Sequence, residues 1–241
     1  ELIQEGGAIA SVYSNLSGAL SQQGKPKEAI ELLNSAISSF PNDIGMALSL
    51  GQTYLSVGDL NNARQLANSI LLKFPTQGEA HFILGNIFLN ENNIDQAILS
   101  FEKTIEALPQ FVEAHFSLGM AFSQKGETEE AEKKWKHSIA LMPNFIPAWI
   151  NLANMAIDAS DYENALSYLD QVISFDPDHF SAIKMKGMTL HTTGEINQAL
   201  ELYQKLHQEQ NPSGEIITLI ANAYRDLDQF EEAEKYYQEA L

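Results

Sequence analysis

The sequence repeats itself every 34 residues, and this period restricts the fold more than any other feature. Prolines recur at that interval five times: Pro41, Pro75, Pro109, Pro143 and Pro177. Alanines keep the interval over a longer stretch: Ala29, Ala63, Ala97, Ala131, Ala165, Ala199 and Ala233. Because no insertion breaks either series, each period is predicted to be one structural unit that packs on the next.

Each period carries two apolar patterns with helical spacing, separated by a turn. In the fourth period Leu118 and Phe122 mark the first helix, and Ala131 and Trp135 mark the second. The turns hold residues that tolerate a left-handed backbone: Gly24, Gly58, Asn92, Gly126 and Gly194. The recurring proline then ends the second helix. The sequence therefore predicts a series of helical hairpins.

The predicted domain organisation is a single array of seven hairpins behind a short lead-in. Residues 1–9 are interpreted as the lead-in or as the end of a preceding helix, and residues 10–241 as one domain. The seven units are residues 10–43, 44–77, 78–111, 112–145, 146–179, 180–213 and a truncated 214–241.

This pattern resembles the tetratricopeptide repeat (TPR), whose units have 34 residues and an ordered set of Leu, Gly, aromatic, Ala and Pro positions. The third unit supplies this set in order: Leu84, Gly85, Phe88, Ala97, Phe101 and Pro109. The resemblance covers residues 10–241 and implies an all-α fold, a right-handed solenoid of antiparallel helix pairs. The sequence is also similar to bacterial TPR proteins, including envelope lipoproteins of pilus and exopolysaccharide assembly.

Composition narrows the classes of partner. The 241 residues include 32 acidic and 14 basic side chains, a net charge of −18, which disfavours nucleic acid and anionic membranes and favours basic or partly apolar protein segments. No apolar run has the length of a membrane span, so membrane insertion by this segment is not expected. Without cysteine, redox chemistry does not choose between the cytoplasm and the bacterial periplasm or cell envelope. Because the chain starts at Glu1, we expect it to be a segment of a longer protein.

The sequence offers no catalytic or metal-binding pattern. His81 and His115 occupy one repeat position, which Trp149 and Ile183 fill in other units, so a packing role is favoured over a metal site. Nucleophile elbows, phosphate-binding loops and zinc or calcium motifs are lacking. We therefore expect a protein without enzymatic activity, cofactor or metal.

In similar repeat solenoids the first helices line a concave groove that holds extended or helical peptides. The residues carried over to that groove by repeat position are Leu48, Gln52, Phe82, Asn86, Phe116, Met120, Ile150, Asn151, Asn154, Lys184, Met188 and Asn222. Amides can pair with peptide groups, and Met and Phe adapt to varied apolar shapes. The alternative interpretation is that these side chains only fill the wall between neighbouring helices.

Charge is uneven along the repeats. The fifth unit has an excess of 6 acids and the seventh an excess of 5, whereas the sixth has none. Either a basic partner is steered to these units or the acids form a solvated outer surface. In the sixth unit Lys186 replaces the leucine of other units, so its stem is expected to lie along the apolar surface while its charge reaches water.

The predicted function is a protein-protein interaction scaffold that binds polypeptide segments in its concave groove and organises a multiprotein complex. Two alternatives stay open. The segment is the substrate-recruiting arm of an enzyme whose catalytic domain lies outside it, or it is a structural scaffold that assembles into homo-oligomers through uncapped ends.

Overall fold

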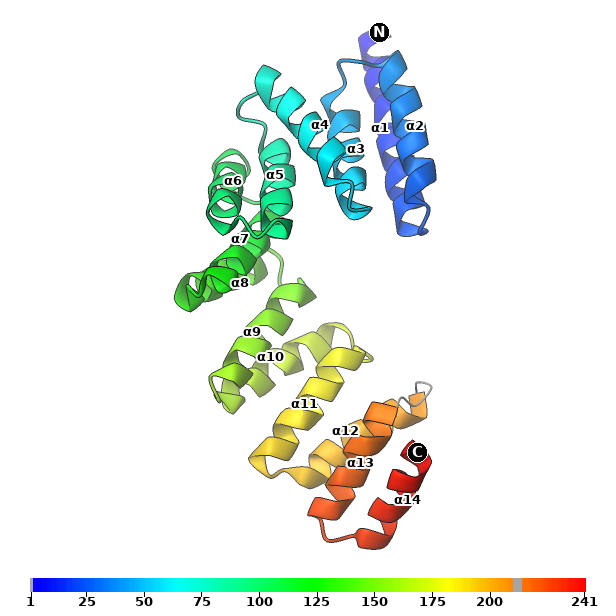
Figure 1. Ribbon diagram of the computed structural model, residues 1–241, viewed down its shortest axis with the longest axis vertical. Coiled ribbons are helices and arrows are strands. Elements are labelled where there is room, and N and C mark those ends of the chain that lie inside the picture. The colour runs from blue at the N-terminus through cyan, green and yellow to red at the C-terminus, as the bar shows by residue number, and fades with distance from the viewer. Residues whose placement is uncertain (1, 210–213) are drawn as a thin grey trace. The chain divides into compact units, whose positions relative to one another are not determined.

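The computed structural model describes residues 2–209 and 214–241, and the side chains of residues 11–208 and 214–241. These residues form fourteen α-helices and no strand (Figure 1). The odd-numbered helices are α1 (Leu2–Gln22), α3 (Ile44–Ser56), α5 (Gly78–Asn90), α7 (Val112–Lys125), α9 (Ile146–Asp158), α11 (Phe180–Thr193) and α13 (Gly214–Asp226). The even-numbered helices are α2 (Pro26–Ser39), α4 (Leu60–Lys73), α6 (Ile94–Ala107), α8 (Thr128–Leu141), α10 (Tyr162–Phe175), α12 (Ile196–Glu209) and α14 (Phe230–Ala240).

The chain divides into two compact units, unit 1 (residues 1–134) and unit 2 (residues 135–241), with the boundary inside α8. In unit 1 the odd-numbered helices lie next to one another, and α2, α4 and α6 each pack against the odd-numbered helices before and after them. In unit 2 each helix from α9 to α14 packs on the next, as in the α13–α14 hairpin of Figure 1. The fold is the predicted all-α solenoid of helix pairs, and we call its odd-numbered helices the inner helices.

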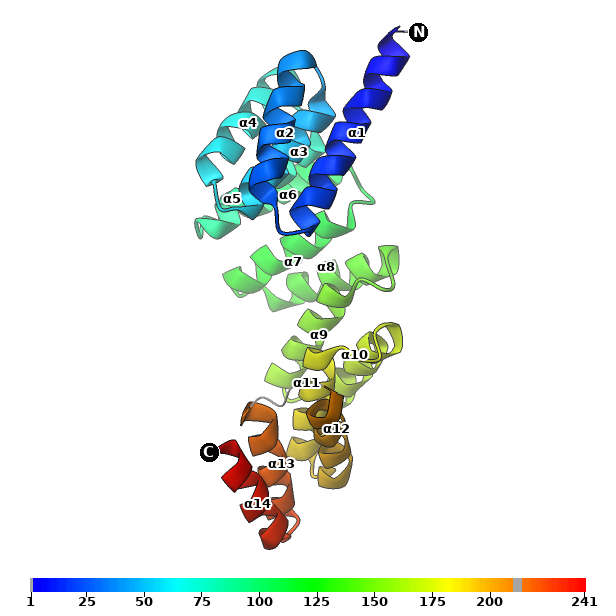
Figure 2. The ribbon, with the colours of Figure 1, turned by 90° about the vertical axis from the view of Figure 1, so that its right-hand side faces the viewer.

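The first helix is longer than the repeat requires. It is one continuous helix of 21 residues, and its N-terminal end extends beyond α2 (Figure 2). Residues 2–9, interpreted from the sequence as a lead-in or the end of a preceding helix, continue directly into the first hairpin. Residue 1 of that predicted segment lies outside the described residues.

Every hairpin turn contains one residue with a left-handed backbone. These residues are Gly24, Gly58, Asn92, Gly126, Ser160, Gly194 and Asp228, and their φ angles lie between 58° and 92°. The five left-handed positions predicted from glycine and asparagine are confirmed. Ser160 and Asp228 adopt the same conformation although L side chains disfavour it, because packing of both helices of a pair determines the path of the turn.

The repeat signature forms the core. All seven of the periodic alanines are buried, with at most 3% of their surface exposed. A glycine on an inner helix lets an aromatic ring of the following helix approach its backbone, as Gly85 does for Phe101 and Gly187 for Tyr203. Trp135, which marks the second helix of the fourth repeat, is 4% exposed. None of the described helices combines the length and the apolar character needed to cross a membrane.

Candidate binding surface

The α1–α3 pair of unit 1 encloses a polar groove of about 230 Å³. Its lining residues are Ser14, Ser17, Gly18, Ser21, Ser49, Gln52, Thr53 and Ser56. Small side chains leave this space open, because five of the eight lining residues are serines, which carry one oxygen beyond Cβ, and Gly18 has no side chain. Of the predicted groove residues only Gln52 lines it, and its amide is exposed.

Four of the six hydroxyls of this groove donate their hydrogens to carbonyls of their own helices. Ser17 Oγ donates to the carbonyl of Ser14 at 2.8 Å, and Thr53 Oγ1 donates to the carbonyl of Ser49 at 2.8 Å. Each oxygen keeps lone pairs that can accept a further hydrogen bond. The groove is therefore neutral and rich in acceptors, which suits the N–H groups of an extended peptide backbone.

An aromatic cluster in unit 1 joins rings of α5, of α6 and of the residue before α7. The ring of Phe82 lies 5.8 Å from that of Phe101 and 4.8 Å from that of Phe111, measured between centroids. Phe82 is partly buried, so one part of its ring is anchored and another part remains accessible. Asn86 is also partly buried, and its Nδ2 donates to the carbonyl of Phe82 at 2.9 Å. Its side-chain oxygen can still accept from a ligand.

The other predicted residues of unit 1 differ in their accessibility. Leu48 belongs to the buried core with 9% exposure, so it offers little surface to a ligand. Phe116 and Met120 on α7 are partly buried. The interpretation that groove positions fill the wall between helices therefore describes Leu48, whereas Gln52 and Phe82 present surface.

In unit 2 two of the predicted groove residues are exposed, and two others bond to side chains of the same unit. Asn154 on α9 and Met188 on α11 are exposed. Lys184 Nζ lies 2.9 Å and 3.1 Å from the carboxylate oxygens of Glu215, and Asn222 Oδ1 accepts from the hydroxyl of Tyr237 at 2.7 Å. The two engaged residues would have to exchange an internal partner for a ligand. The remaining predicted residues, Ile150 and Asn151, are partly buried.

The histidines that raised the question of a metal site bond to the chain itself. His81 Nε2 lies 2.8 Å from the carbonyl oxygen of Pro75, and His115 Nε2 lies 2.9 Å from that of Pro109. Because a carbonyl can only accept, the proton must be on Nε2 in both rings. Trp149 uses the same position in its repeat, donating from Nε1 to the Pro143 carbonyl at 2.7 Å.

This position is therefore a hydrogen-bonding site as well as a packing site. An N–H at the fourth residue of an inner helix satisfies the carbonyl of the proline that ends the preceding helix. In the sixth repeat this position is held by Ile183, six residues after Pro177, which has no side-chain donor. Lys205 Nζ donates to the Pro177 carbonyl instead, at 2.9 Å. Within residues 11–208 and 214–241, no three His, Cys, Asp or Glu side chains are grouped so that they could hold a metal ion.

The sixth repeat supplies cations to its acidic neighbours. Lys186 pairs with Asp170 of the fifth repeat, which confirms that its charge reaches the surface and gives it a partner there. Lys205 pairs with Asp178 at 3.1 Å. Part of the acidic excess of the fifth repeat is thus neutralised within unit 2.

The sixth repeat also pairs with the seventh through a histidine. His191 Nε2 lies 2.9 Å from Asp226 Oδ2, and the neighbouring Arg225 pairs with the same carboxylate at 2.8 Å. The hydrogen bond from Arg225, followed by that from His191, lowers the pKa of Asp226. Burial raises the pKa of the nearby Tyr203 phenol to about 12. These groups connect repeats and do not form a catalytic arrangement, since no accessible nucleophile is paired with a base among them.

Comparisons with known proteins agree with this architecture. Family models described as tetratricopeptide repeats match residues 20–87 and 84–135, and a model described as the N-terminal TPR region of Psidin matches residues 154–241. The sequence matches no curated protein.

Solved structures show the same fold. PilW, described as a widely conserved type IV pilus biogenesis factor, is 19% identical with a TM-score of 0.74, over 88% of this chain and 98% of that one. PilF of Pseudomonas aeruginosa is 13% identical with a TM-score of 0.71, over 93% of this chain and 98% of that one. A thermophilic TPR protein of Thermus thermophilus is 18% identical with a TM-score of 0.65, over 75% of this chain and 98% of that one. With the repeat signature, the fourteen helices of the described residues and three matching family models, the chain belongs to the tetratricopeptide-repeat family.

Proposed function

We propose that this TPR protein binds segments of other polypeptides along its inner helices and so organises a multiprotein complex. TPR arrays are in general non-catalytic scaffolds for protein-protein interaction. The observation that carries the finer proposal is the surface of unit 1, where an acceptor-rich groove lies between α1 and α3 and an aromatic cluster is centred on Phe82 of α5.

The chemistry of this surface fits a polypeptide better than a small charged ligand. The groove lining contains hydroxyls and one amide but no charged side chain. Hydroxyl and amide oxygens can accept from backbone N–H groups regardless of sequence, while aromatic rings offer contact area to apolar side chains. Such a surface can accept several related segments, which a scaffold requires.

A matched pair of crosslinking positions tests the proposal. The photo-crosslinker p-benzoylphenylalanine is placed at position 52, in the groove, or at position 65 on α4. Gln52 and Gln65 are both exposed glutamines, so each change removes the same side chain. We expect protein adducts from native lysate at position 52 and few at position 65. Equal adducts at both positions would show that the groove has no special role.

The inner surface of unit 2 needs a separate test. Met188 on α11 is 44% exposed, and Leu72 on α4 of unit 1 is 86% exposed. Met188→Glu and Leu72→Glu therefore introduce the same charge at two exposed apolar positions. If α11 contributes to binding, capture of the proteins crosslinked at position 52 should fall for Met188→Glu and persist for Leu72→Glu.

A further inference from the structure

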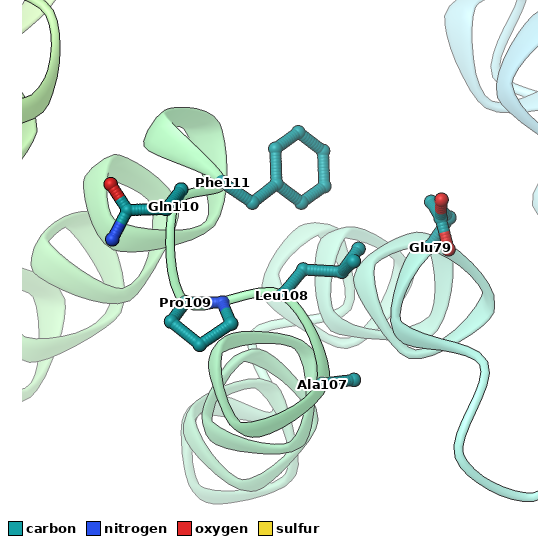
Figure 3. A pocket seen from close by; sticks show the side chains of 6 residues that line it. All are labelled: Glu79, Ala107, Leu108, Pro109, Gln110 and Phe111. Atoms are coloured by element: carbon teal, nitrogen blue, oxygen red, sulfur yellow. The ribbon is translucent and has the colours of Figure 1, made fainter.

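A pocket of about 480 Å³ lies in unit 1, where the first turn of α5 meets the turn between α6 and α7 (Figure 3). Its lining residues are Glu79, Ala107, Leu108, Pro109, Gln110 and Phe111. Figure 3 shows the side chains of Leu108 and Phe111 pointing toward the side on which Glu79 stands. The pocket thus combines apolar walls with one carboxylate, and we call it the Glu79 pocket.

Packing within unit 1 holds the walls in place. Gly78 has no side chain, and a Cβ there would lie 2.8 Å from Leu108 Cδ1, so Leu108 rests directly on the backbone of α5. The ring of Phe111 is held against Phe82 at 4.8 Å between centroids. The single hydroxyl hydrogen of Thr104 is shared between the carbonyl of Ser100 in its own helix, at 3.0 Å, and the carbonyl of Gly78 at the start of α5, at 3.2 Å. The pocket is therefore formed before any ligand arrives.

The single charge of the pocket is partly satisfied and partly available. Gln77 Nε2 donates to Glu79 Oε2 at 2.6 Å, which orients the carboxylate. A carboxylate has about four acceptor sites, so this bond leaves capacity for a ligand. The third repeat contains five acids, of which Glu91 pairs with Arg64 and Asp95 with Lys125. The other three, Glu79, Glu102 and Glu106, exceed its single base, Lys103. This acidic excess around the Glu79 pocket favours a cationic ligand.

We infer that the Glu79 pocket binds an arginine side chain of a basic polypeptide. The arginine stem lies against Leu108, the guanidinium plane stacks near the ring of Phe111, and its N–H groups donate to Glu79. Arginine combines an apolar stem with a planar cation that pairs with carboxylates and stacks on aromatic rings. A shorter or anionic side chain would leave either the walls or the carboxylate unmatched.

This inference rests on the proposed function, because it specifies the kind of polypeptide that the inner helices accept. Glu79 and Phe82 are three residues apart on α5, so they lie on one face of the helix. A segment whose arginine occupies the pocket can therefore place its next residues against the exposed part of Phe82.

Two short peptides that differ only in the charge of one side chain test the inference. N-acetyl-Ala-Arg-Ala-amide and the same peptide with citrulline, the uncharged isostere of arginine, are titrated into the ¹⁵N-labelled 241-residue chain. We expect the arginine peptide to shift the amide resonances of residues 79, 108, 110 and 111, and the citrulline peptide to bind on the order of fivefold more weakly. Equal affinities, or shifts confined to other residues, would overturn the inference.

Three variants separate the pocket from general electrostatic attraction. Glu79→Gln should weaken the arginine peptide on the order of fivefold, whereas Glu102→Gln, an identical change at an exposed site of the same repeat, should leave its affinity unchanged. Ala107→Trp fills the pocket from an exposed position and should abolish the shifts. Equal losses for Glu79→Gln and Glu102→Gln, or binding that survives Ala107→Trp in a variant that melts like the parent, would contradict the inference.

The outcomes also separate this inference from the proposed function. If crosslinks at position 52 persist while the arginine peptide leaves the amide resonances of residues 79, 108, 110 and 111 unshifted, the pocket inference is wrong and groove binding stands. If the peptide binds the pocket but position 52 yields no more adducts than position 65, the proposed function fails and the pocket is an isolated arginine site.

Discussion

Gly187→Ala tests the packing that joins the two helices of the sixth repeat. Gly187 on α11 lies directly against the ring of Tyr203 on α12. A Cβ at this position would be 2.5 Å from Tyr203 Cε1 and 3.0 Å from Cδ1, whereas ordinary contact begins at 3.4 Å. The ring is 0% exposed, so it cannot move into solvent to make room. The added methyl group must push α11 and α12 apart.

The net change in the free energy of unfolding is the difference between a steric cost and a gain in helix propensity. Inserting a methyl group into a packed core costs about 1–3 kcal/mol, and replacing glycine by alanine inside a helix returns about 0.5–1 kcal/mol. We therefore expect Gly187→Ala to lower the free energy of unfolding by about 1–2 kcal/mol. Gly18→Ala supplies the control, since Gly18 lies inside α1 and a Cβ there meets nothing within 4 Å. Gly18→Ala should stabilise the chain.

Urea unfolding of Gly187→Ala is followed by tryptophan fluorescence, because both tryptophans, Trp135 and Trp149, belong to unit 2. Gly18 belongs to unit 1, so unfolding of Gly18→Ala is followed by far-UV circular dichroism. A double-mutant cycle with Tyr203→Leu removes the ring that causes the clash. In that background Gly187→Ala should cost little, giving a coupling free energy of about 1–2 kcal/mol. If Gly187→Ala stabilises the chain as Gly18→Ala does, the close approach of glycine and ring is wrong.

Three further predictions concern hydrogen bonds and ionisation. Trp149→Phe keeps a ring but leaves the Pro143 carbonyl without its donor, so the free energy of unfolding in urea should fall by about 1 kcal/mol. An unchanged free energy of unfolding would mean that water replaces the indole N–H. Tyr203→Phe removes a buried hydroxyl without a partner and should stabilise unit 2 by about 1 kcal/mol. Because burial raises the Tyr203 pKa from 10.0 to about 12, the parent should lose stability relative to this variant as pH rises from 10 to 12, and parallel pH profiles would contradict that. Since Arg225 lowers the Asp226 pKa below 3.8, the contribution of the carboxylate to stability falls as the pH falls. Asp226→Asn should therefore destabilise unit 2 more at pH 6 than at pH 2, as measured by thermal unfolding at both values.

Much of the fold could be predicted because it depends on local preferences repeated in register. A left-handed turn favours glycine or asparagine, and five such residues recurred at one repeat position. The other two signals are also short-ranged: alanine marks a close helix contact, and proline ends the helix that precedes it. The period multiplied these weak local signals until hairpins were the only consistent interpretation.

The candidate surface was less predictable, because accessibility depends on how far apart neighbouring helices lie. Leu48 and Phe82 share one repeat position, yet Leu48 is buried while Phe82 keeps part of its ring exposed. The Glu79 pocket could not be found from the sequence either. It exists because Leu108 packs directly against the backbone of Gly78, which has no side chain, and these residues are 30 positions apart in the sequence.

By itself the sequence determined the helix pairs, their turns and the alanine core, since these follow from short-range preferences and from a strict period. Tertiary structure alone decided which polar groups meet. The ring N–H groups of His81 and Trp149 reach proline carbonyls six residues earlier, and Lys186 reaches Asp170 on another helix. The physical reason is that a hydrogen bond or ion pair needs its atoms within a few ångströms, a condition that residue type and spacing leave open and helix packing settles.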